Sequence, residues 1–501
     1  MGQLRLLPGT PDDNNRDYLP ERIRGSDIVV NENGNNSIPY PARLRERRGP
    51  LTPDGQDDVW FEYVPASYDG SEPVPLVVSL HGGMMTGWGQ AIYTSWTLVA
   101  EANGFLAAFP NASRDRFWQV QWGSWDYKTD VPNPPPPGAT PSPENAADCR
   151  DVQLVLGLVE HMKKTYNVDP GRIFLQGMSM GNLMTALIAR HCSALFAGAA
   201  GSGCSSFLDR LFTPEGRVRG SGCLPVWQSR PECNGIPPER ENELRANTFN
   251  RYYWMKRNAC ERIPEIAVIG ENNLAFYRGA GADQVFLDIK NRDHGQTLDD
   301  AALIWDYLFS GCRRLPDGSI EHTASRLPRK GDAFAFAIAE GEGWAWHAQR
   351  VVPLPTPARR WQKLKYHGLN GGTRVRGEYC MAPLRFLAAV FSASLEEGED
   401  GATARLTLPD GRKLQFARGS IGCVIDNDLR SMYCEAIHRD GQLLVSVEWF
   451  CRYLFNLTVT SCEGVTYVTD HFAELSADMA ALLRDLLRNG GALPDYDSLS
   501  I

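Results

Sequence analysis

Apolar runs and helix-like segments alternate along the first two thirds of the chain. Residues 75–80 form an apolar, β-branched run bounded by turn-forming residues, which is typical of a buried strand, and residues 105–110 form the next strand-like run. Residues 94–104 between them have the pattern of a helix that stops at glycine. Apolar side chains between Val152 and Met162 also have helical spacing. This alternation predicts an α/β fold with a mostly parallel, doubly wound sheet covered by helices on both faces.

A serine flanked by glycines stands where one predicted strand gives way to a helix. The apolar run of residues 172–176 leads into Gly177-Met178-Ser179-Met180-Gly181, and a helix-forming run follows at residues 184–190. A strand that turns sharply into a helix with serine at the apex is a nucleophile elbow. Its glycines are needed because strand and helix approach too closely for a Cβ atom. An ordinary glycine-rich turn is the alternative, but the flanking strand and helix favour a nucleophile.

A second element of an acyl-transfer site precedes this serine. The predicted strand of residues 75–80 ends in His81-Gly82-Gly83, and the loop after it offers backbone N–H groups to a developing oxyanion. The predicted oxyanion donors are the N–H groups of Met180, directly after the serine, and of Gly83. His81 is expected to brace the loop rather than to titrate during catalysis.

A serine hydroxyl needs a base to take its proton, and the base needs a group that orients it. Of the nine histidines, His294 lies in a loop just past the last predicted strand of the sheet, residues 285–289, which favours it as the base. The acid is expected in the turn after residues 225–230, where Glu232 and Asn234 stand. Glu232 is the predicted acid, because a carboxylate stabilises the imidazolium and asparagine brings no charge.

Three tryptophans lie in the loop between the second strand and the following helix. Trp118, Trp122 and Trp125 are predicted to line a substrate pocket for an aromatic or sugar-bearing ester, and core packing is an equal alternative. Asp148 and Asp151 stand at the start of the next helix, where carboxylates stabilise the helix dipole, so no catalytic role is expected for them.

Taken in chain order, these motifs resemble those of the polyhydroxybutyrate depolymerase and feruloyl esterase group of α/β-hydrolases, the carbohydrate esterase family 1 type. The resemblance covers about residues 56–313 and rests on six segments, residues 80–83, 107–110, 151–152, 166–173, 177–181 and 293–295, together with the tryptophan loop. It implies the α/β-hydrolase fold and hydrolysis of carboxylic esters, with Ser179 and His294 as nucleophile and base. Two departures stand out. Members usually have glycine where Asn182 stands, and their catalytic aspartate falls on Asn234.

The C-terminal third contains an internal repeat. Residues 381–395 correspond to residues 445–459, and each copy is predicted to run from a strand end through a short helix into a strand. The two copies predict a small α+β domain that resembles the copper amine oxidase N-terminal-like domain, an accessory module. No metal-ligand spacing is found in it.

The predicted organisation has five parts. It comprises an irregular N-terminal arm (1–55), the α/β-hydrolase domain (56–313), a linker with a β-hairpin around residues 340–342 (314–369), the repeated accessory domain (370–475), and a C-terminal helix and tail (476–501).

Composition narrows the functional classes. The chain has 501 residues, 43% hydrophobic and 22% charged, and a net charge of −9 that argues against a nucleic-acid partner. No apolar run is long enough for a transmembrane helix, and the twelve cysteines show no zinc-like or dense disulfide pattern. Residues 1–5 lack a signal-peptide core, which predicts a cytoplasmic location, although the usual setting of the accessory module is extracellular or in the cell envelope.

The sequence therefore predicts a serine carboxylic-ester hydrolase that needs no cofactor or metal. Its expected partner is an ester substrate, either a polyester or a hydroxycinnamoyl or acetyl ester. A catalytically impaired binding protein on the same scaffold stays open because of Asn234. A serine peptidase or acyltransferase also stays open, because those enzymes share the triad.

Overall fold

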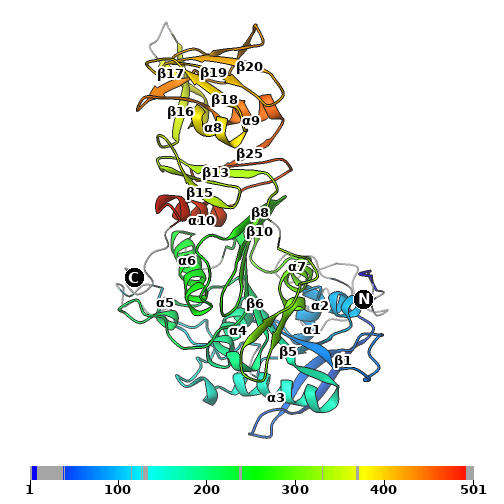
Figure 1. Ribbon diagram of the computed structural model, residues 1–501. Coiled ribbons are helices and arrows are strands. Elements are labelled where there is room, and N and C mark those ends of the chain that lie inside the picture. The colour runs from blue at the N-terminus through cyan, green and yellow to red at the C-terminus, as the bar shows by residue number, and fades with distance from the viewer. Residues whose placement is uncertain are drawn as a thin grey trace. The chain divides into compact units, whose positions relative to one another are not determined.

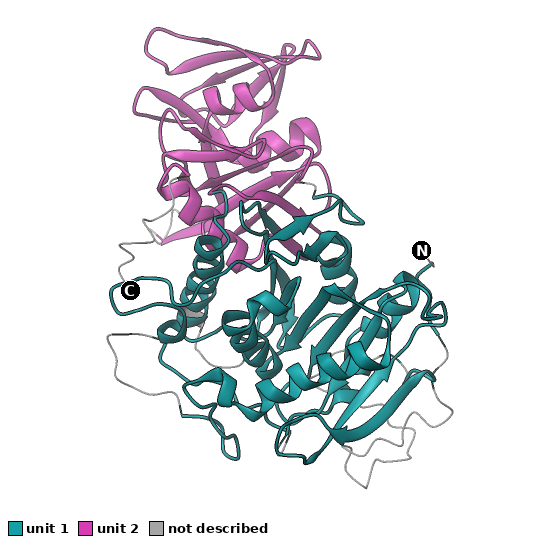
Figure 2. Ribbon diagram, turned by 60° about the horizontal axis from the view of Figure 1, so that its bottom comes forward, with its two compact units in different colours: residues 1–261, 275–329, 494–501 teal, residues 262–274, 330–493 magenta. Residues whose placement is uncertain are grey.

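The computed structural model describes residues 3–7, 9, 38, 40–113, 116–125, 127, 134–235, 240–329, 331–367 and 372–491. The chain divides into two compact units (Figure 2). Unit 1 comprises the described residues up to Glu261 together with Ala275–Arg329. Unit 2 comprises Arg262–Leu274 and the described residues from 331 to 491.

A single large sheet runs through unit 1 (Figure 1). Its strands, in spatial order, are β1 (Leu44–Pro50), β2 (Asp57–Tyr63), β4 (Leu106–Pro110), β3 (Val74–Leu80), β5 (Val168–Met178), β6 (Gly198–Ser202), β7 (Val226–Cys233) and β10 (Gln284–Asp293). From β4 to β10 all neighbouring strands are parallel, whereas β1 and β2 are antiparallel to their neighbours. In the order of the sheet, β10 is followed by β9 (Asn272–Tyr277) and β8 (Glu265–Ile269), and the boundary between the units falls within β9.

Helices cover both faces of this sheet. Successive side chains of a strand point to opposite faces, so the buried strands present apolar side chains on both sides. They are α1 (Gly87–Tyr93), α2 (Trp96–Asn103), α3 (Arg150–Thr165), α4 (Met180–His191), α5 (Leu208–Leu211), α6 (Arg240–Arg257) and α7 (Asp300–Tyr307). On β5, Phe174 and Gln176 point to the face of α2 and α7, where Phe174 contacts Trp305 and Gln176 accepts from Trp96. Gly177 points to the opposite face, towards α4. The predicted α/β-hydrolase fold is confirmed.

Strand β5 and helix α4 approach each other through two glycines. A Cβ atom at Gly177 would lie 2.2 Å from the carbonyl oxygen of Gly181, and one at Gly181 would lie 2.2 Å from the carbonyl oxygen of Leu80. Both neighbours are backbone atoms, so no side chain can move aside. This contact brings the start of α4 against the ends of β3 and β5.

The N-terminal arm differs from its prediction. Of residues 1–55, Leu44–Pro50 form the edge strand β1, which pairs antiparallel with β2. Most side chains of β1 are exposed, and it has no apolar alternation that would mark a strand. This strand forms because its backbone pairs with β2, and not because of its own side-chain pattern. Beyond the sheet, β11 (Cys312–Arg314) and β12 (Ile320–His322) form an antiparallel pair.

Unit 2 contains three small sheets. The first has the order β15 (Arg350–Pro353), β14 (Trp344–His347), β13 (Ala335–Ala339), β26 (Val465–Thr469) and β25 (Thr458–Cys462). The second has the order β16 (Arg359–His367), β17 (Gly372–Pro383), β24 (Gln442–Ser446) and β23 (Ile437–Arg439). The third runs in chain order through β18 (Ser394–Glu397), β19 (Thr403–Thr407), β20 (Lys413–Ala417), β21 (Gly422–Ile425) and β22 (Asp428–Ser431).

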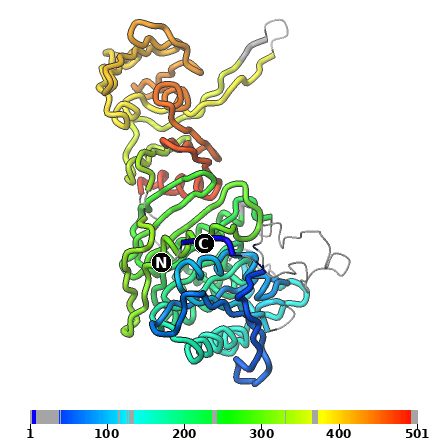
Figure 3. Tube along the Cα trace, turned by 90° about the vertical axis from the view of Figure 1, so that its right-hand side faces the viewer, coloured from blue at the N-terminus to red at the C-terminus, as the bar shows by residue number. Residues whose placement is uncertain are grey.

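The region predicted as a linker is part of unit 2. Its predicted hairpin corresponds to β13 and β14, and β13 also pairs with β26, more than a hundred residues away. Residues 335–353 therefore belong to a sheet and not to a connection. The local sequence pattern could not reveal a pairing between strands so far apart in the chain. In the β16–β17 hairpin only the last three residues of β17 pair with β24, and the rest extends past the sheet (Figure 3).

The two predicted repeat copies have the same order of elements. In the first, β17 leads into α8 (Leu384–Val390) and then β18; in the second, β24 leads into α9 (Val447–Phe455) and then β25. Apolar side chains of both helices share one buried cluster that includes Phe386, Leu387, Phe450 and Leu454. The last helix, α10 (Ala477–Arg488), begins at Ser476, which caps the N–H of Met479. Among the described residues, no helix is both long and apolar enough to cross a membrane.

We predict that Gly181→Ala destabilises unit 1. Alanine in a helix is intrinsically favoured over glycine by about 1 kcal/mol, but the added methyl would meet the carbonyl oxygen of Leu80. Overpacking against backbone that cannot yield is expected to lower the free energy of unfolding by about 1–3 kcal/mol in denaturant titrations. Gly343→Ala is the matched control, because a Cβ there meets no atom within 4 Å. Equal stability of Gly181→Ala and wild type would contradict this account of the elbow.

Candidate active site

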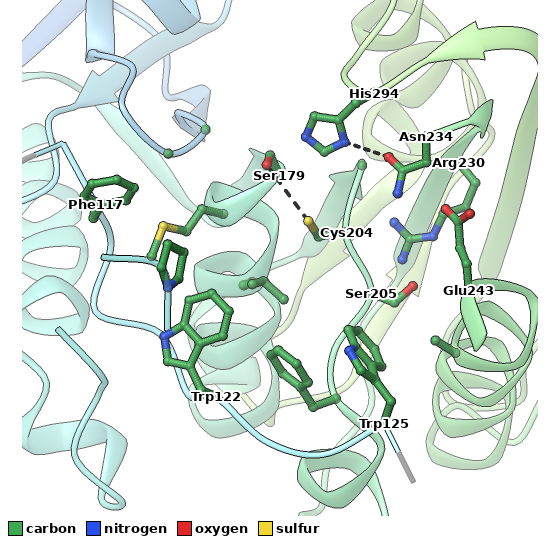
Figure 4. Close-up of a pocket in the computed structure, with 18 of the residues that line it drawn as sticks. Phe117, Trp122, Trp125, Ser179, Cys204, Ser205, Arg230, Asn234, Glu243 and His294 are labelled. Atoms are coloured by element: carbon green, nitrogen blue, oxygen red, sulfur yellow. Dashed lines mark hydrogen bonds between the residues drawn. The ribbon is translucent and has the colours of Figure 1, made fainter. Parts of the chain in front are cut away.

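The carboxyl ends of five parallel strands meet at a cavity of about 650 Å³ (Figure 4). Open α/β sheets bind ligands at this edge. The lining residues that directly follow a strand are Ser179 after β5, Gly203 after β6, Asn234 after β7 and His294 after β10, and Gly82 and Gly83 come two and three residues after the end of β3. The cavity therefore collects side chains from segments more than two hundred residues apart in the chain.

Ser179 occupies the turn between β5 and α4 in a strained conformation. Its φ of 55° and ψ of −120° lie where residues with a Cβ atom rarely occur. The N–H of Ser179 donates to the carbonyl oxygen of Ser202 over 2.8 Å, which ties the turn to β6. Its Oγ atom points into the cavity, 3.9 Å from Sγ of Cys204. This is the geometry of a nucleophile elbow.

Asn182 stands where the family that the sequence resembles was expected to have glycine, and Gly201 accommodates its side chain. A Cβ atom at Gly201 on β6 would overlap the side-chain amide of Asn182. With glycine there, Nδ2 of Asn182 donates to the carbonyl oxygen of Cys204 over 2.5 Å. The asparagine therefore ties the start of α4 to the loop after β6.

His294 lies beside Ser179, with Gly203 next to both. A Cβ atom at Gly203 would lie 3.0 Å from Cε1 of His294 and 3.4 Å from the backbone nitrogen of Ser179. The Nδ1 atom of His294 lies 2.6 Å from Oδ1 of Asn234 (Figure 4). An amide oxygen only accepts hydrogen bonds, so Nδ1 carries the proton and Nε2 keeps its lone pair.

The surroundings of His294 favour the neutral imidazole. Burial and then the charge of Arg230 lower its pKa to about 4, against the opposite effect of Asp293. The ring is therefore neutral near pH 7 and able to accept a proton at Nε2.

The predicted acid, Glu232, faces a different part of β10. Its carboxylate pairs with Nζ of Lys290 at 3.3 Å and accepts the backbone N–H of Asn291 at 3.1 Å. The residue against His294 is Asn234, which lies just past the end of β7, at the position where the resemblance noted in the sequence implies an aspartate. The preference for Glu232 rested on its charge, and the pairing of β7 with β10 directs that charge to Lys290 instead.

Backbone donors for an oxyanion lie on both sides of Ser179. The N–H of Met180 belongs to the first turn of α4, where N–H groups have no partner within the helix. In the loop after β3, the N–H of Met84 donates to the carbonyl oxygen of Arg116 and that of Met85 to Gly82. Gly82 and Gly83 also line the cavity, and Gly83, which lies against the side chain of Met180, is the predicted donor in that loop.

His81 and Trp118 hold this loop together. His81 is fully buried; its Nδ1 lies 2.6 Å from the carbonyl oxygen of Gly82, and its Nε2 accepts the N–H of Ala112. Burial lowers the pKa of His81 to about 4. Trp118 is also fully buried, and its Nε1 donates to the carbonyl oxygen of His81. Trp118, predicted to line the pocket, therefore packs in the core because its indole satisfies a buried carbonyl.

The other two tryptophans of the loop form the apolar wall of the cavity. Trp122 and Trp125 line it together with Phe207, whose ring centroid is 4.4 Å from that of Trp125 and 5.6 Å from that of Trp122. Asp151 shapes this loop from the start of α3, because its buried carboxylate accepts the N–H groups of Ser113 and Gln119.

The rest of the lining includes polar residues that were not predicted from the sequence. They are Cys204, Ser205, Arg230, Glu243 and Asn247. Cys204 and Ser205 follow β6, and Arg230 lies near the end of β7. Because ligands bind at the carboxyl ends of strands in such sheets, these positions could have been predicted from the sequence to lie near the site. Glu243 and Asn247 lie on α6, one turn apart, and nothing in the local sequence separates them from an exposed helix face.

Two proteins of known activity are similar to parts of this chain. It is 28% identical over 111 residues to a bifunctional acetylxylan esterase/xylanase of Neocallimastix patriciarum, over 22% of this chain and 13% of that protein. It is 29% identical over 142 residues to poly(3-hydroxyalkanoate) depolymerase C of Paucimonas lemoignei, over 28% of this chain and 30% of that protein. The chain is thus related to esterase-type hydrolases, and the matches span less than a third of either relative.

Solved structures with a similar arrangement are more distant. An acetyl xylan esterase from Aspergillus awamori has 16% identity and a TM-score of 0.37, over 53% of this chain and 98% of that one. A ferulic acid esterase from Anaeromyces mucronatus has 14% identity and a TM-score of 0.31, over 60% and 95%.

No model of a known protein family matches the chain. The expected likeness of the C-terminal part to a copper amine oxidase N-terminal-like domain is therefore without support. Among the described residues, no three His, Cys, Asp or Glu side chains are grouped to hold a metal ion.

Proposed function

We propose that the chain is a serine hydrolase of carboxylic esters that works through an acyl-enzyme. The observation that carries this proposal is the strained Ser179 elbow, with His294 beside it and Asn234 on Nδ1 of His294, at the mouth of one cavity. The similarity to an acetylxylan esterase and to a polyhydroxyalkanoate depolymerase supports the same class of reaction.

The first half-reaction transfers the acyl group to Ser179. His294 takes the proton of the serine hydroxyl at Nε2 while Oγ attacks the ester carbonyl carbon. The negative charge that develops on the carbonyl oxygen is stabilised by the N–H groups of Met180 and Gly83. When the tetrahedral intermediate collapses, the bond to the alcohol oxygen breaks, and His294 returns the proton to the leaving alcohol.

The second half-reaction releases the acid. A water molecule gives a proton to Nε2 of His294, and its oxygen attacks the acyl carbon bound to Ser179. The same N–H groups stabilise the second oxyanion, and collapse returns the proton to Oγ of Ser179. The cavity wall of Trp122, Trp125 and Phe207 suits acyl or alcohol groups that pack against aromatic rings, such as hydroxycinnamoyl, sugar-linked acetyl or polyester units.

We propose Asn234, and not Glu232, as the residue that orients His294. Its amide oxygen keeps the proton on Nδ1 and so leaves Nε2 as the base, as in the Cys-His-Asn sites of papain-like proteases. It adds no negative charge to stabilise the imidazolium. This neutral partner also motivates a second candidate function, a binding protein in which the hydrolase site is inactive. Peptidase and acyltransferase activities would use the same residues.

Unit 2 is proposed as an accessory module built from the two strand–helix–hairpin copies around α8 and α9. Their shared apolar cluster supports a single compact module.

We predict that Ser179→Ala lowers kcat/KM for short p-nitrophenyl esters by at least about 10³-fold, because the attacking oxygen is gone. Release of p-nitrophenol is the measurement, with circular dichroism to verify folding. A fluorophosphonate probe should label the wild type and not the variant. Hydrolysis that survives Ser179→Ala would exclude the serine mechanism, and absence of both hydrolysis and labelling in the wild type would favour the binding protein.

Two substitutions separate the candidate partners of His294. Asn234→Ala removes the acceptor that holds the imidazole and is expected to lower kcat/KM at least about tenfold. Glu232→Gln keeps the shape of the side chain and changes only its contacts with Lys290 and Asn291. The variant should therefore have a kcat/KM within about twofold of that of the wild type. The reverse ranking of the two variants would make Glu232 the acid.

The pH dependence of kcat/KM should reflect a base with a low pKa. Only neutral His294 accepts the serine proton, and its pKa is lowered to about 4. The acid limb of kcat/KM for a neutral ester is therefore expected near pH 4 and not near 6.5, the ordinary value for histidine. Tryptophan fluorescence at each pH is the control for acid unfolding. An acid limb near pH 6.5 with the fold intact would contradict the account of His294.

A further inference from the structure

A buried polar network lies on the face of the large sheet that α2 and α7 cover. At its centre is Gln176 of β5, which is 1% exposed and stands three residues before Ser179. Phe174, two residues earlier on the same face, packs against the rings of Trp305 and Phe309. Because an apolar side chain suits this face so well at Phe174, a buried amide at Gln176 calls for an explanation.

The orientation of the Gln176 amide is fixed by its partners. Its Oε1 atom accepts from Nε1 of Trp96 at 3.1 Å and from Oγ of Ser79 at 2.5 Å. An indole N–H can only donate, so the oxygen of the amide must face Trp96. The nitrogen therefore faces the other way, where Nε2 of Gln176 donates to Oε1 of Gln296 over 2.8 Å.

Gln296 belongs to the segment that carries the candidate base. It is 1% exposed and stands two residues after His294, and its backbone N–H donates to the hydroxyl of Tyr93 on α1 over 2.9 Å. Further along the same segment, Oγ of Ser95 donates to the carbonyl oxygen of Leu298. The segment after His294 is thus held by its backbone to α1 and to the start of α2, and by the Gln296 side chain to β5.

The hydrogen bond between Gln176 and Gln296 connects the supports of the two reacting groups. Gln176 stands on the strand that ends at Ser179, and Gln296 stands next but one to His294. Asn234 contacts the imidazole ring itself, whereas Gln296 holds the backbone from which that ring projects. Proton transfer from the serine hydroxyl to the imidazole requires both groups within hydrogen-bond reach, so the relative place of these two segments matters to the chemistry.

We propose that Gln176 and Gln296 are positioning residues whose hydrogen bond sets the place of His294 relative to Ser179. The inference rests on the proposed esterase function and adds two residues to its machinery. Neither glutamine is among the described residues that line the cavity, so their effect passes through the base and not through substrate contact. Both half-reactions use His294, and both should slow together when the bond is lost. KM then changes little, because it depends on the ratio of the two rates.

Gln296→Met removes this bond with little other disturbance. Methionine is close to glutamine in length and volume but offers no amide oxygen, and Gln176 keeps its bonds with Trp96 and Ser79. The measurement is steady-state hydrolysis of p-nitrophenyl acetate by the full-length protein. We expect kcat to fall at least about tenfold, because a misplacement of about 1 Å in a reacting group can cost about a hundredfold. KM should stay within about twofold of the wild-type value.

A second pair of buried glutamines supplies a matched control. Nε2 of Gln284, the first residue of β10, donates to Oε1 of Gln228 on β7, also over 2.8 Å. Gln228→Met removes an acceptor of the same kind, and Gln228 is not among the described lining residues. Each variant leaves one buried amide donor unpaired, so both should lower the free energy of unfolding in denaturant titrations to a similar extent. Only Gln296→Met should lower kcat, and Gln228→Met should keep it within about twofold.

The asparagine variants keep the test open if a methionine variant does not fold. Gln296→Asn and Gln228→Asn retain the amide but are one methylene shorter, so the hydrogen bond cannot span the gap. The same changes in kcat and KM are expected of them.

Several outcomes overturn the inference. A Gln296 variant with wild-type kcat, in a protein whose hydrolysis depends on Ser179, rejects it and leaves the esterase function standing. An equal loss of kcat in the Gln228 variant assigns the effect to general destabilisation, and a loss confined to KM assigns it to substrate binding. A wild type without Ser179-dependent hydrolysis overturns the esterase function and, with it, this inference.

Discussion

The close approach of β5 and α4 is the constraint on which the candidate site depends. Gly177 and Gly181 let backbone pack against backbone, and Ser179 is held between them at a positive φ. The strain in this turn is stabilised by the sheet on either side, through the hydrogen bond from Ser179 to Ser202 and the contact of Gly181 with the end of β3. The same turn brings Ser179 and the first residue of α4, Met180, to the wall of the cavity.

The rest of the site follows from parallel strands that end at one edge. Ser179, Gly203, Asn234 and His294 each come directly after a strand, and Gly83 comes three residues after one, so the pairing order of the sheet brings them together. Buried braces keep the loops in register. His81 and Trp118 satisfy the backbone of the loop after β3, and Asp151 holds the aromatic loop by two N–H groups. The cavity is therefore a product of the sheet topology more than of any single loop.

The sequence was most informative where chemistry and local structure coincide. The elbow could be predicted because its glycines, its serine and its flanking elements are contiguous, and His294 because it follows a predicted strand. The sequence favoured Glu232 over Asn234 on charge alone, but which of them reaches His294 depends on where β7 pairs with β10, and Lys290 comes from that distant strand. Trp118 and Trp122 lie four residues apart in one loop, yet Trp118 is buried in the core and Trp122 lines the cavity. The sequence does not distinguish the two environments. Residues 44–50 became a strand only through pairing with β2.

Electrostatics distinguish this site from a triad that ends in a carboxylate. Nδ1 of His294 contacts a neutral amide, that of Asn234, and burial together with the charge of Arg230 lowers the pKa of His294 to about 4, so the imidazole stays neutral well into the acid range. The neutral imidazole can accept a proton but is a weak base, and Asn234 supplies no charge that would stabilise the imidazolium.

The most direct test is to trap the acyl-enzyme. The wild type, mixed with p-nitrophenyl acetate and quenched in acid, should gain the mass of one acetyl group, and peptide mass spectrometry should locate it on Ser179. An acetyl group on Cys204 or elsewhere, or turnover with no acylated Ser179 in either steady state or single-turnover quenching, would contradict the account.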